Sequence, residues 1–231
     1  SQEELLGVAK KLRDLKVPVD GIIQDWQYWP PGTNTWGSHL FDTNRYPDPV
    51  GMFKELHDLH YHTLISVWAK FDLGSSNSAE LNAVGGMFPQ ITSYAFPPGH
   101  GQWYDPFAIA GRQTYWRQMR DQLFAKGADG WWLDAPEPEI GGMGFRSYQT
   151  PMGPGYTVYN AYPLMHSTGI YQGQRATTGQ KRVVILTRSA YAGQQRNSAI
   201  TWSGDIQGTW DVLRAQIPAG LNFSMSGIPY W

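Results

Sequence analysis

The chain has 231 residues, enough for one substantial domain. Its 18 Lys and Arg residues are balanced by 19 Asp and Glu residues, so it lacks the charge bias of proteins that bind nucleic acid or insert at an anionic membrane surface. Cysteine is absent, which excludes a disulfide framework, a thiolate nucleophile and a cysteine-bound zinc, and no run of residues is long and apolar enough to span a bilayer.

Aromatic residues make up 14% of the chain and include 11 Trp and 13 Tyr. Flat aromatic rings pack in protein cores, and they also stack on the apolar C–H patches of sugars. Composition alone therefore leaves open both a Trp-rich core and a carbohydrate-binding site.

The first third of the sequence predicts two helix–strand pairs. Apolar residues at helical spacing predict a helix over residues 2–16, and residues 19–25 predict a strand followed by an aromatic loop. Pro49 begins a second predicted helix, and the β-rich run 63–68 is the next predicted strand.

The middle of the chain contains a long irregular stretch and the most informative strand. Residues 73–104 are rich in Gly, Ser and Pro without a sustained period, which predicts a long functional loop. A helix over about 105–126 follows. In residues 129–139, apolar and aromatic residues run into Asp134, and prolines then forbid a regular continuation. We predict a short buried strand that ends by presenting Asp134 on a rigid loop.

The remaining sequence continues the alternation of elements. The predicted elements are a loop over 141–154, a helix over about 156–172, strands over 182–188 and 199–202, a helix over 209–217 and a last strand over 221–225.

Alternating helices and strands indicate an α/β fold with a parallel sheet, here of about six strands. A closed (β/α)8 barrel needs roughly 250 residues. We therefore predict a TIM-type barrel that is incomplete in this chain, which lacks the first and the last of the eight barrel strands. The alternative is a doubly wound open sheet, which would bring a Gly-rich phosphate turn after its first strand; residues 24–27 contain no such turn.

Two aspartates, Asp134 and Asp205, each follow an apolar strand, and catalytic residues of barrels lie at that end of a strand. Paired carboxyl groups about 5–5.5 Å apart can cleave a glycosidic bond, one attacking while the other protonates the leaving oxygen. An isolated Asp is more often a helix cap or a solvated loop acid. However, Asp25 and Arg188 also fall just past apolar strands, so a barrel would bring all four side chains to one mouth.

Three tryptophans are candidates for a sugar platform. Trp132 lies two residues before Asp134 and hence on the same strand face, and Trp68 and Trp202 are the last residues of other predicted strands. Barrel core is the alternative for each ring. Arg188 could donate a fork of N–H groups to substrate hydroxyls or to a carboxylate, or it could form a structural ion pair.

Metal and serine chemistry are not indicated. The spacing of His57, His60 and His62 does not fit the i, i+4 pair of a zinc site, and no neighbouring carboxylates complete a set of metal ligands. The Gly-x-Ser-x-Gly motif is absent. We expect no metal and no cofactor.

Six ordered motifs, spread over nearly the whole chain, carry a family resemblance. They occupy residues 23–29, 131–139, 159–164, 186–196, 201–206 and 213–224. The sequence resembles glycoside hydrolase family 31, and within it the bacterial α-xylosidases. The resemblance implies a retaining α-glycosidase with a (β/α)8 barrel.

The same resemblance implies roles for the candidate residues. Asp134 matches the nucleophile and Asp205 the general acid/base, which requires Asp134 to be ionised and Asp205 protonated. Glu137 matches a supporting acid. Residues at the remaining matched positions hold the sugar or line its pocket, and these are Asp25, Trp68, Trp132, Arg188 and Trp202.

The sequence departs from the commoner family motif at Pro136. In that motif, Asn stands immediately before the supporting acid. We interpret Pro136 as a mark of xylosidase-like members. A late pocket histidine and flanking β domains are expected outside the chain. Residues 1–231 are thus expected to be the partial catalytic barrel of a larger multidomain glycosidase, with little activity in isolation. The expected partner is an oligosaccharide or glycoside, with no nucleic acid and no membrane insertion.

The leading functional hypothesis is an α-xylosidase that releases xylose, for example from xyloglucan fragments, in a periplasmic or extracellular location. An α-glucosidase or transglycosylase of the same family is the alternative, since xylose differs from glucose only by lacking the hydroxymethyl group. A non-catalytic carbohydrate-binding relative would lose one of the two acids, and both Asp134 and Asp205 are present.

Overall fold

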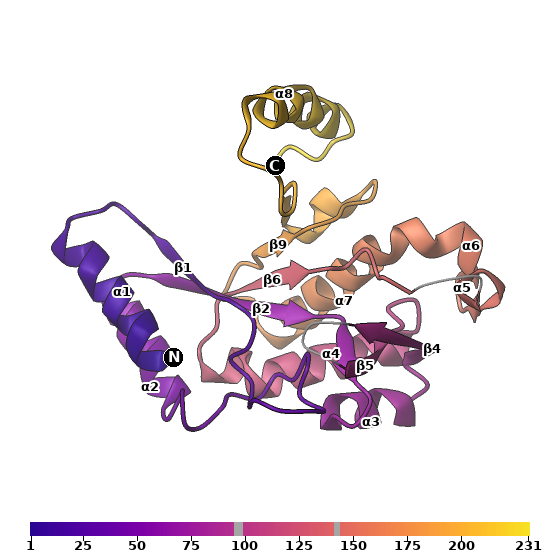
Figure 1. The fold of residues 1–231 in the computed structure, drawn as a ribbon, viewed down its shortest axis with the longest axis horizontal. Coiled ribbons are helices and arrows are strands. Elements are labelled where there is room, and N and C mark those ends of the chain that lie inside the picture. Colours follow the sequence, from indigo (N-terminus) through magenta and orange to yellow (C-terminus); the bar gives the residue numbers. More distant parts are fainter. Residues whose placement is uncertain (95–98, 141–143) are drawn as a thin grey trace.

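A parallel sheet forms the centre of the computed structural model, which describes residues 1–94, 99–140 and 144–231. Each strand pairs with the strand that follows it along the chain in this sheet, the order found in (β/α) barrels (Figure 1). The strands, in spatial order, are β1 (Gly21–Gln24), β2 (His62–Trp68), β6 (Gly130–Asp134), β9 (Ile185–Thr187) and β10 (Ala199–Thr201). The prediction of an incomplete α/β barrel is confirmed, with five strands instead of six within the described residues.

Helices alternate with these strands, and their ends follow local sequence signals. At the first helix, Ser1 and Glu4 form a capping box, and at the second Asp48 accepts a hydrogen bond from the Gly51 N–H. The helices of the alternation are α1 (Gln2–Asp14), α2 (Pro49–Asp58), α4 (Ile109–Gln122) followed by the 3-10 turn η1 (Phe124–Lys126), α7 (Tyr162–Thr177) and α8 (Trp210–Met225).

Strand β6 separates a core face from an open face. Trp131 and Leu133 are fully buried, and the Trp131 indole N–H donates to Gln174 Oε1 of α7 at 2.8 Å while its ring packs at 5.8 Å from Trp116 of α4. Trp132 and Asp134 alternate with them and are only half-buried. The predicted placement of Trp132 and Asp134 on one strand face is therefore correct.

The prediction of a long loop over residues 73–104 is wrong. The segment, with its flanks, contains α3 (Ser76–Ala83) and a three-stranded antiparallel sheet of β3 (Lys70–Asp72), β5 (Gly99–Tyr104) and β4 (Met87–Tyr94), while residues 95–98 lie outside the described part. Its strands carry the buried Phe88 and Trp103, whose rings both pack on Tyr162 of the later helix α7, and local periodicity does not reveal such distant contacts.

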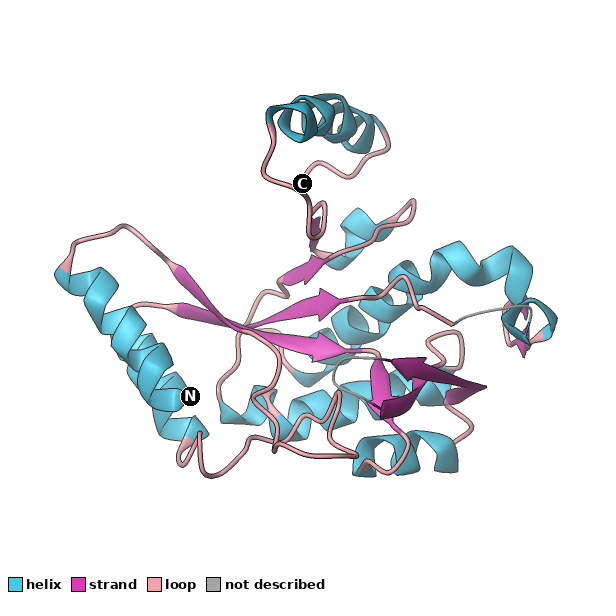
Figure 2. Cartoon of the chain, in the orientation of Figure 1, coloured by secondary structure: helices cyan, strands magenta, loops and turns pink. Residues whose placement is uncertain are grey.

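The loop predicted over 141–154 is also partly ordered, although its residues 141–143 lie outside the described ranges. It contains α5 (Gly144–Ser147), β7 (Gln149–Thr150) and β8 (Gly153–Pro154). The next predicted helix is confirmed but begins as α6 (Gly155–Val158) and the 3-10 turn η2 (Tyr159–Ala161) before α7. The arrows of β2 and β6 point toward the side on which these insertions lie (Figure 2).

The strand predicted over 221–225 is wrong, because these residues form the last turns of α8. The helix predicted over 209–217 also continues past Pro218, which lies within α8. The apolar residues of α8 recur at helical spacing, and this period outweighs the proline signal. No residue of α8 is buried, and the helix stands apart from the sheet (Figure 1). Among the described residues, no helix is both long enough and apolar enough to cross a bilayer.

Candidate active site

The register of the parallel sheet brings the candidate residues to one edge. Trp68 at the end of β2 pairs with Asp134 at the end of β6, and Leu133 pairs with Thr187 of β9, so Arg188 follows beside Asp134. Trp202, just past β10, donates its backbone N–H to the Thr187 carbonyl at 3.4 Å. The mouth predicted from strand-end positions is thus formed by the ends of neighbouring strands.

Arg188 links two carboxylates in this mouth. Its Nη1 lies 3.3 Å from Asp134 Oδ1, while its Nε and Nη2 donate to both carboxylate oxygens of Glu137 at 3.0–3.2 Å. These contacts on two sides fix the planar guanidinium in one orientation. Arg188 is therefore a preorganised cation next to Asp134.

The backbone after Asp134 is constrained. Ala135 adopts φ = 48°, a left-handed conformation that is unusual for a residue other than glycine, and its N–H donates to Asp134 Oδ1 at 2.9 Å. Pro136 follows directly. Such conformations cost free energy and concentrate at functional sites. Here the conformation orients the carboxylate at the end of β6.

Four acids, Asp25, Asp134, Glu137 and Asp205, share one electrostatic environment. Burial raises the pKa of Asp134, the Arg188 charge and the Ala135 N–H oppose this rise, and Glu137 and Asp205 add to it. Partial burial also raises the pKa of Asp25, the Trp26 N–H opposes the rise, and Asp205 again adds to it. The charge of Asp205 therefore acts on both acids, and the charge of Arg188 favours the ionised form of Asp134.

The aromatic candidates form two groups. The rings of Trp132 and Trp202 meet edge to face with centroids 5.6 Å apart at 71°. Trp68 packs in the same manner on Trp36, with centroids 4.8 Å apart at 76°. Trp132, Trp202 and Trp68 are half-buried at the strand ends, and Trp68 also packs against the core, whereas Trp131 is fully buried in it.

Comparison with known proteins identifies the family. The model of the glycosyl hydrolases family 31 TIM-barrel domain matches residues 1–231. The chain belongs to glycoside hydrolase family 31. The family 31 domain is 43% identical to an α-xylosidase of Saccharolobus solfataricus over an alignment that covers all of this chain and 30% of that protein.

Two further relatives of the family 31 domain agree. A protein of Pseudescherichia vulneris, described as an uncharacterized family 31 glucosidase, is 31% identical and is matched over all of this chain and 43% of its own length. The crystal structure of an α-xylosidase from Xanthomonas citri superimposes with a TM-score of 0.91 at 41% identity, covering all of this chain and 26% of that one. The chain spans less than half the length of each of these relatives.

Sequence reasoning missed Lys70, which borders the family 31 site. Its side chain is buried, and its Nζ lies 4.9 Å from the ring centroid of Trp36 and 5.6 Å from that of Trp68. Burial lowers the pKa of Lys70, and the charges of Glu139 and Asp72 oppose this change. Trp68 ends β2 and Lys70 begins β3 of the second sheet, so no local pattern in the sequence places the two side chains together.

The opposite end of β6 is structural. Asp129 accepts hydrogen bonds from His57 Nε2 at 2.8 Å, from the Thr63 N–H at 2.9 Å and from Lys181 Nζ at 2.8 Å. His57 is thus engaged at the N-terminal end of the sheet, away from Asp134. In the described part of the chain, no three His, Asp or Glu side chains converge to hold a metal ion.

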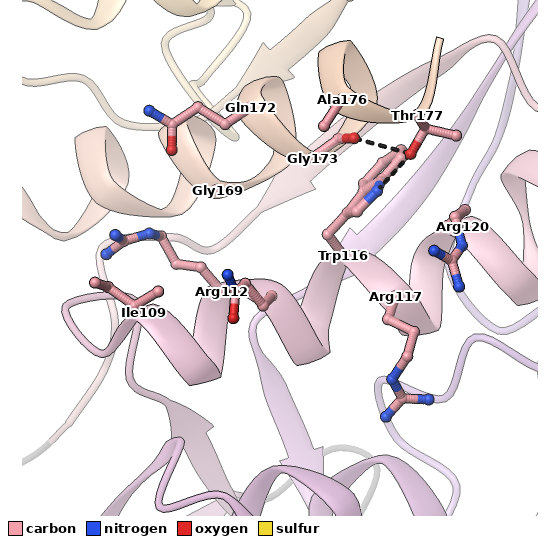
Figure 3. Close-up of a pocket in the computed structure, with 11 residues that line it drawn as sticks. Ile109, Arg112, Trp116, Arg117, Arg120, Gly169, Gln172, Gly173, Ala176 and Thr177 are labelled. Atoms are coloured by element: carbon pink, nitrogen blue, oxygen red, sulfur yellow. Dashed lines mark hydrogen bonds between the residues drawn. The ribbon is translucent and has the colours of Figure 1, made fainter.

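A hollow of about 740 Å³ lies on the outer layer between α4 and α7 (Figure 3). Gly173 allows the helices to approach, because a Cβ there would lie 2.2 Å from Trp116 Cγ. The Trp116 indole N–H donates to Thr177 Oγ1 at 3.1 Å across this contact. None of the candidate site residues lines the hollow, so we assign it no part in the chemistry.

Proposed function

We propose that this chain is the catalytic part of a larger, multidomain, retaining α-glycosidase that releases α-linked xylose from the ends of oligosaccharides such as xyloglucan fragments. The observation that carries the proposal is the carboxylate of Asp134, paired with Arg188 at the end of β6 and within reach of the charge of Asp205. Two carboxyl groups flanking a sugar are the requirement for this reaction.

In the proposed reaction, the ionised Asp134 attacks the anomeric carbon as Asp205 donates its proton to the leaving oxygen. The glycosidic bond breaks, and a covalent glycosyl-enzyme forms through Asp134. Asp205, now ionised, removes a proton from water, which attacks the anomeric carbon and releases both xylose and Asp134. Arg188 supports the first step because its positive charge favours ionised Asp134 against the effect of burial.

The remaining residues are assigned to binding. Asp25 would accept hydrogen bonds from sugar hydroxyls, and Trp68, Trp132 and Trp202 would present aromatic faces to C–H patches of the ring. Glu137 would act indirectly, by holding Arg188 in position. The rest of the barrel and flanking β domains of the longer protein would complete the pocket.

Xylosyl specificity is favoured over glucosyl specificity by the names of the more similar relatives, at 43% and 41% identity. The relative at 31% identity carries the name of a glucosidase, so an α-glucosidase or a transglycosylase is the alternative. A non-catalytic carbohydrate-binding protein would need only the aromatic residues, whereas this chain keeps both Asp134 and Asp205.

The test is hydrolysis of 4-nitrophenyl α-xyloside and α-glucoside by the full-length protein that contains this chain. We expect preference for the xyloside, abolished in Asp134→Ala and reduced about 10²–10⁴-fold in Asp205→Ala. Preference for the glucoside would retain the mechanism and reject the xylosidase assignment. Binding of sugar without turnover of either glycoside would reject the enzyme proposal in favour of a binding protein.

A further inference from the structure

A second cleft, of about 520 Å³, lies between the insertion that follows β6 and the loop that follows β9. This volume is within the range of about 300–1,000 Å³ common for ligand sites. The insertion, which carries α5 and α6, lies on the side toward which β6 points (Figure 1). The lining residues that matter here are three tyrosines and two polar side chains, namely Tyr156, Tyr159, Tyr191, Arg146 and Asn160.

The cleft adjoins the catalytic loop. The Tyr159 hydroxyl donates to the carbonyl of Pro138, the residue after Glu137. Burial raises the pKa of Tyr159, and the charges of Glu139 and Glu137 raise it further. Tyr191 lies three residues after Arg188, on the loop that delivers that guanidinium. The cleft thus borders both segments that hold the Arg188–Glu137 pair.

The lining has the chemistry of a saccharide site. Tyr156 is 68% exposed and Tyr191 is 42% exposed, so both rings offer surface to a ligand. Within the described residues, the side chains of Tyr156, Tyr191, Arg146 and Asn160 form no hydrogen bond or ion pair. Sugars match such surfaces, because their C–H patches stack on aromatic rings and their hydroxyls take up free donors and acceptors.

Charge favours a neutral ligand over a metal ion. Among the described residues that line the cleft, none is acidic and Arg146 is the one cation. Arginine donates readily to sugar hydroxyls through its fixed set of N–H groups. A neutral oligosaccharide can therefore use every polar group on this surface.

We propose that this cleft binds the part of the oligosaccharide on the leaving-group side of the scissile bond. The inference rests on the proposed function, which puts the terminal sugar between Asp134 and Asp205. The rest of the substrate must leave the mouth along a wall, and the wall beyond Glu137 presents the exposed rings of Tyr156 and Tyr191 together with polar side chains that have no hydrogen-bond partner among the described residues. Tyr156 and Tyr191 are the platforms, and Arg146 and Asn160 contact the hydroxyls.

The test compares two substrates of the full-length enzyme that differ only in their leaving group. One is a xylose-capped xyloglucan oligosaccharide, and the other is α-xylosyl fluoride, whose fluoride occupies no sugar subsite. For Tyr156→Ala and Tyr191→Ala, we expect kcat/KM on the oligosaccharide to fall about tenfold, equivalent to ~1.4 kcal/mol. The value for the fluoride should stay within about twofold.

The matched controls are Tyr156→Phe and Tyr191→Phe, which keep the ring and should retain most of the parent activity on both substrates. Thermal unfolding of each variant would confirm an intact fold. Equal losses on both substrates, or no loss on the oligosaccharide, would overturn the assignment of the cleft. If the parent enzyme hydrolyses neither substrate, the proposed function itself fails, and this inference fails with it.

Discussion

Arg188 and Glu137 form a forked ion pair, with Nε and Nη2 of the guanidinium 3.0–3.2 Å from the carboxylate oxygens. The third nitrogen, Nη1, is thereby directed to Asp134 at 3.3 Å. Glu137 acts as a positioning residue in this arrangement, since it fixes the cation that opposes the effect of burial on Asp134. Asp134, Glu137 and Arg188 thus form one connected group of charges.

Replacing Arg188 should shift the pH dependence of the enzyme. Asp134 must be ionised to attack, and burial already raises its pKa. In Arg188→Met the opposing charge is lost, so the pKa of Asp134 rises further and the acid limb of kcat/KM moves to higher pH. A shift of about one pH unit would correspond to ~1.4 kcal/mol. The measurement is a pH profile of kcat/KM with α-xylosyl fluoride.

The matched control for that variant is Arg182→Met, which removes an exposed arginine before the opposite end of β9. It should leave the acid limb in place. An unchanged acid limb in Arg188→Met would mean that Asp134 is not the group whose ionisation limits activity.

Replacing Asp205 should affect two substrates to different extents. In the proposed mechanism, Asp205 gives its proton to the leaving oxygen, whereas fluoride leaves without one. For Asp205→Asn, we expect kcat/KM to fall about 10²–10⁴-fold on a xylose-capped xyloglucan oligosaccharide and far less on α-xylosyl fluoride. Equal losses on the two substrates would contradict the role of Asp205 as the proton donor.

Substitutions of the two acids at opposite ends of β6 should have separate effects, one on stability and the other on activity. Asp129→Asn removes the charged acceptor of His57, Thr63 and Lys181, and should cost about 2 kcal/mol of folding free energy, lowering Tm by roughly 5 °C. Its kcat/KM at a temperature where it is folded should be close to that of the parent. Asp134→Asn should instead abolish activity with little effect on Tm.

The stability loss in Asp129→Asn should itself depend on pH. Burial alone would raise the pKa of Asp129, but hydrogen bonds from Lys181, Thr63 and His57 outweigh it and lower the pKa below its usual value. A lowered pKa contributes stability above the unfolded value of about 3.9, and this contribution is lost as pH falls through the folded value. The Tm difference from the parent should therefore be largest near neutral pH and shrink in acid; a constant difference would contradict the linkage.

Residues 1–231 expressed alone should be poorly active and prone to self-association. Along α8, Trp210, Leu213, Ile217, Leu221 and Met225 are between 53% and 87% exposed, which is a continuous apolar stripe without a partner in the described part of this chain. Size-exclusion chromatography would detect self-association, and binding of a hydrophobic dye would detect the exposed apolar stripe. Hydrolysis of 4-nitrophenyl α-xyloside would measure activity. A monomeric fragment with full activity would show that the expectation is wrong.

The sequence by itself determined the class of fold and the positions of the candidate acids. The cause is local, because alternating helix and strand periods predict a parallel sheet, and the residues just past its strands must meet at one edge. The order of the elements along the chain was enough to place Asp134, Arg188 and Trp202 at that edge, and the motifs pointed to the family. Helical spacing in α8 was present as well, but the apolar run 221–225 also fits a strand, and the strand predicted there was wrong.

Only the tertiary structure decided which of these side chains interact. The engagement of Arg188 with both Asp134 and Glu137 depends on the register of β6 against β9, and the position of Lys70 against Trp36 and Trp68 depends on how the β3–β5–β4 sheet packs. The cleft at Tyr156 and Tyr191 likewise unites segments more than thirty residues apart. Register and packing between distant segments are long-range properties, which the local periodicity of a single sequence does not encode.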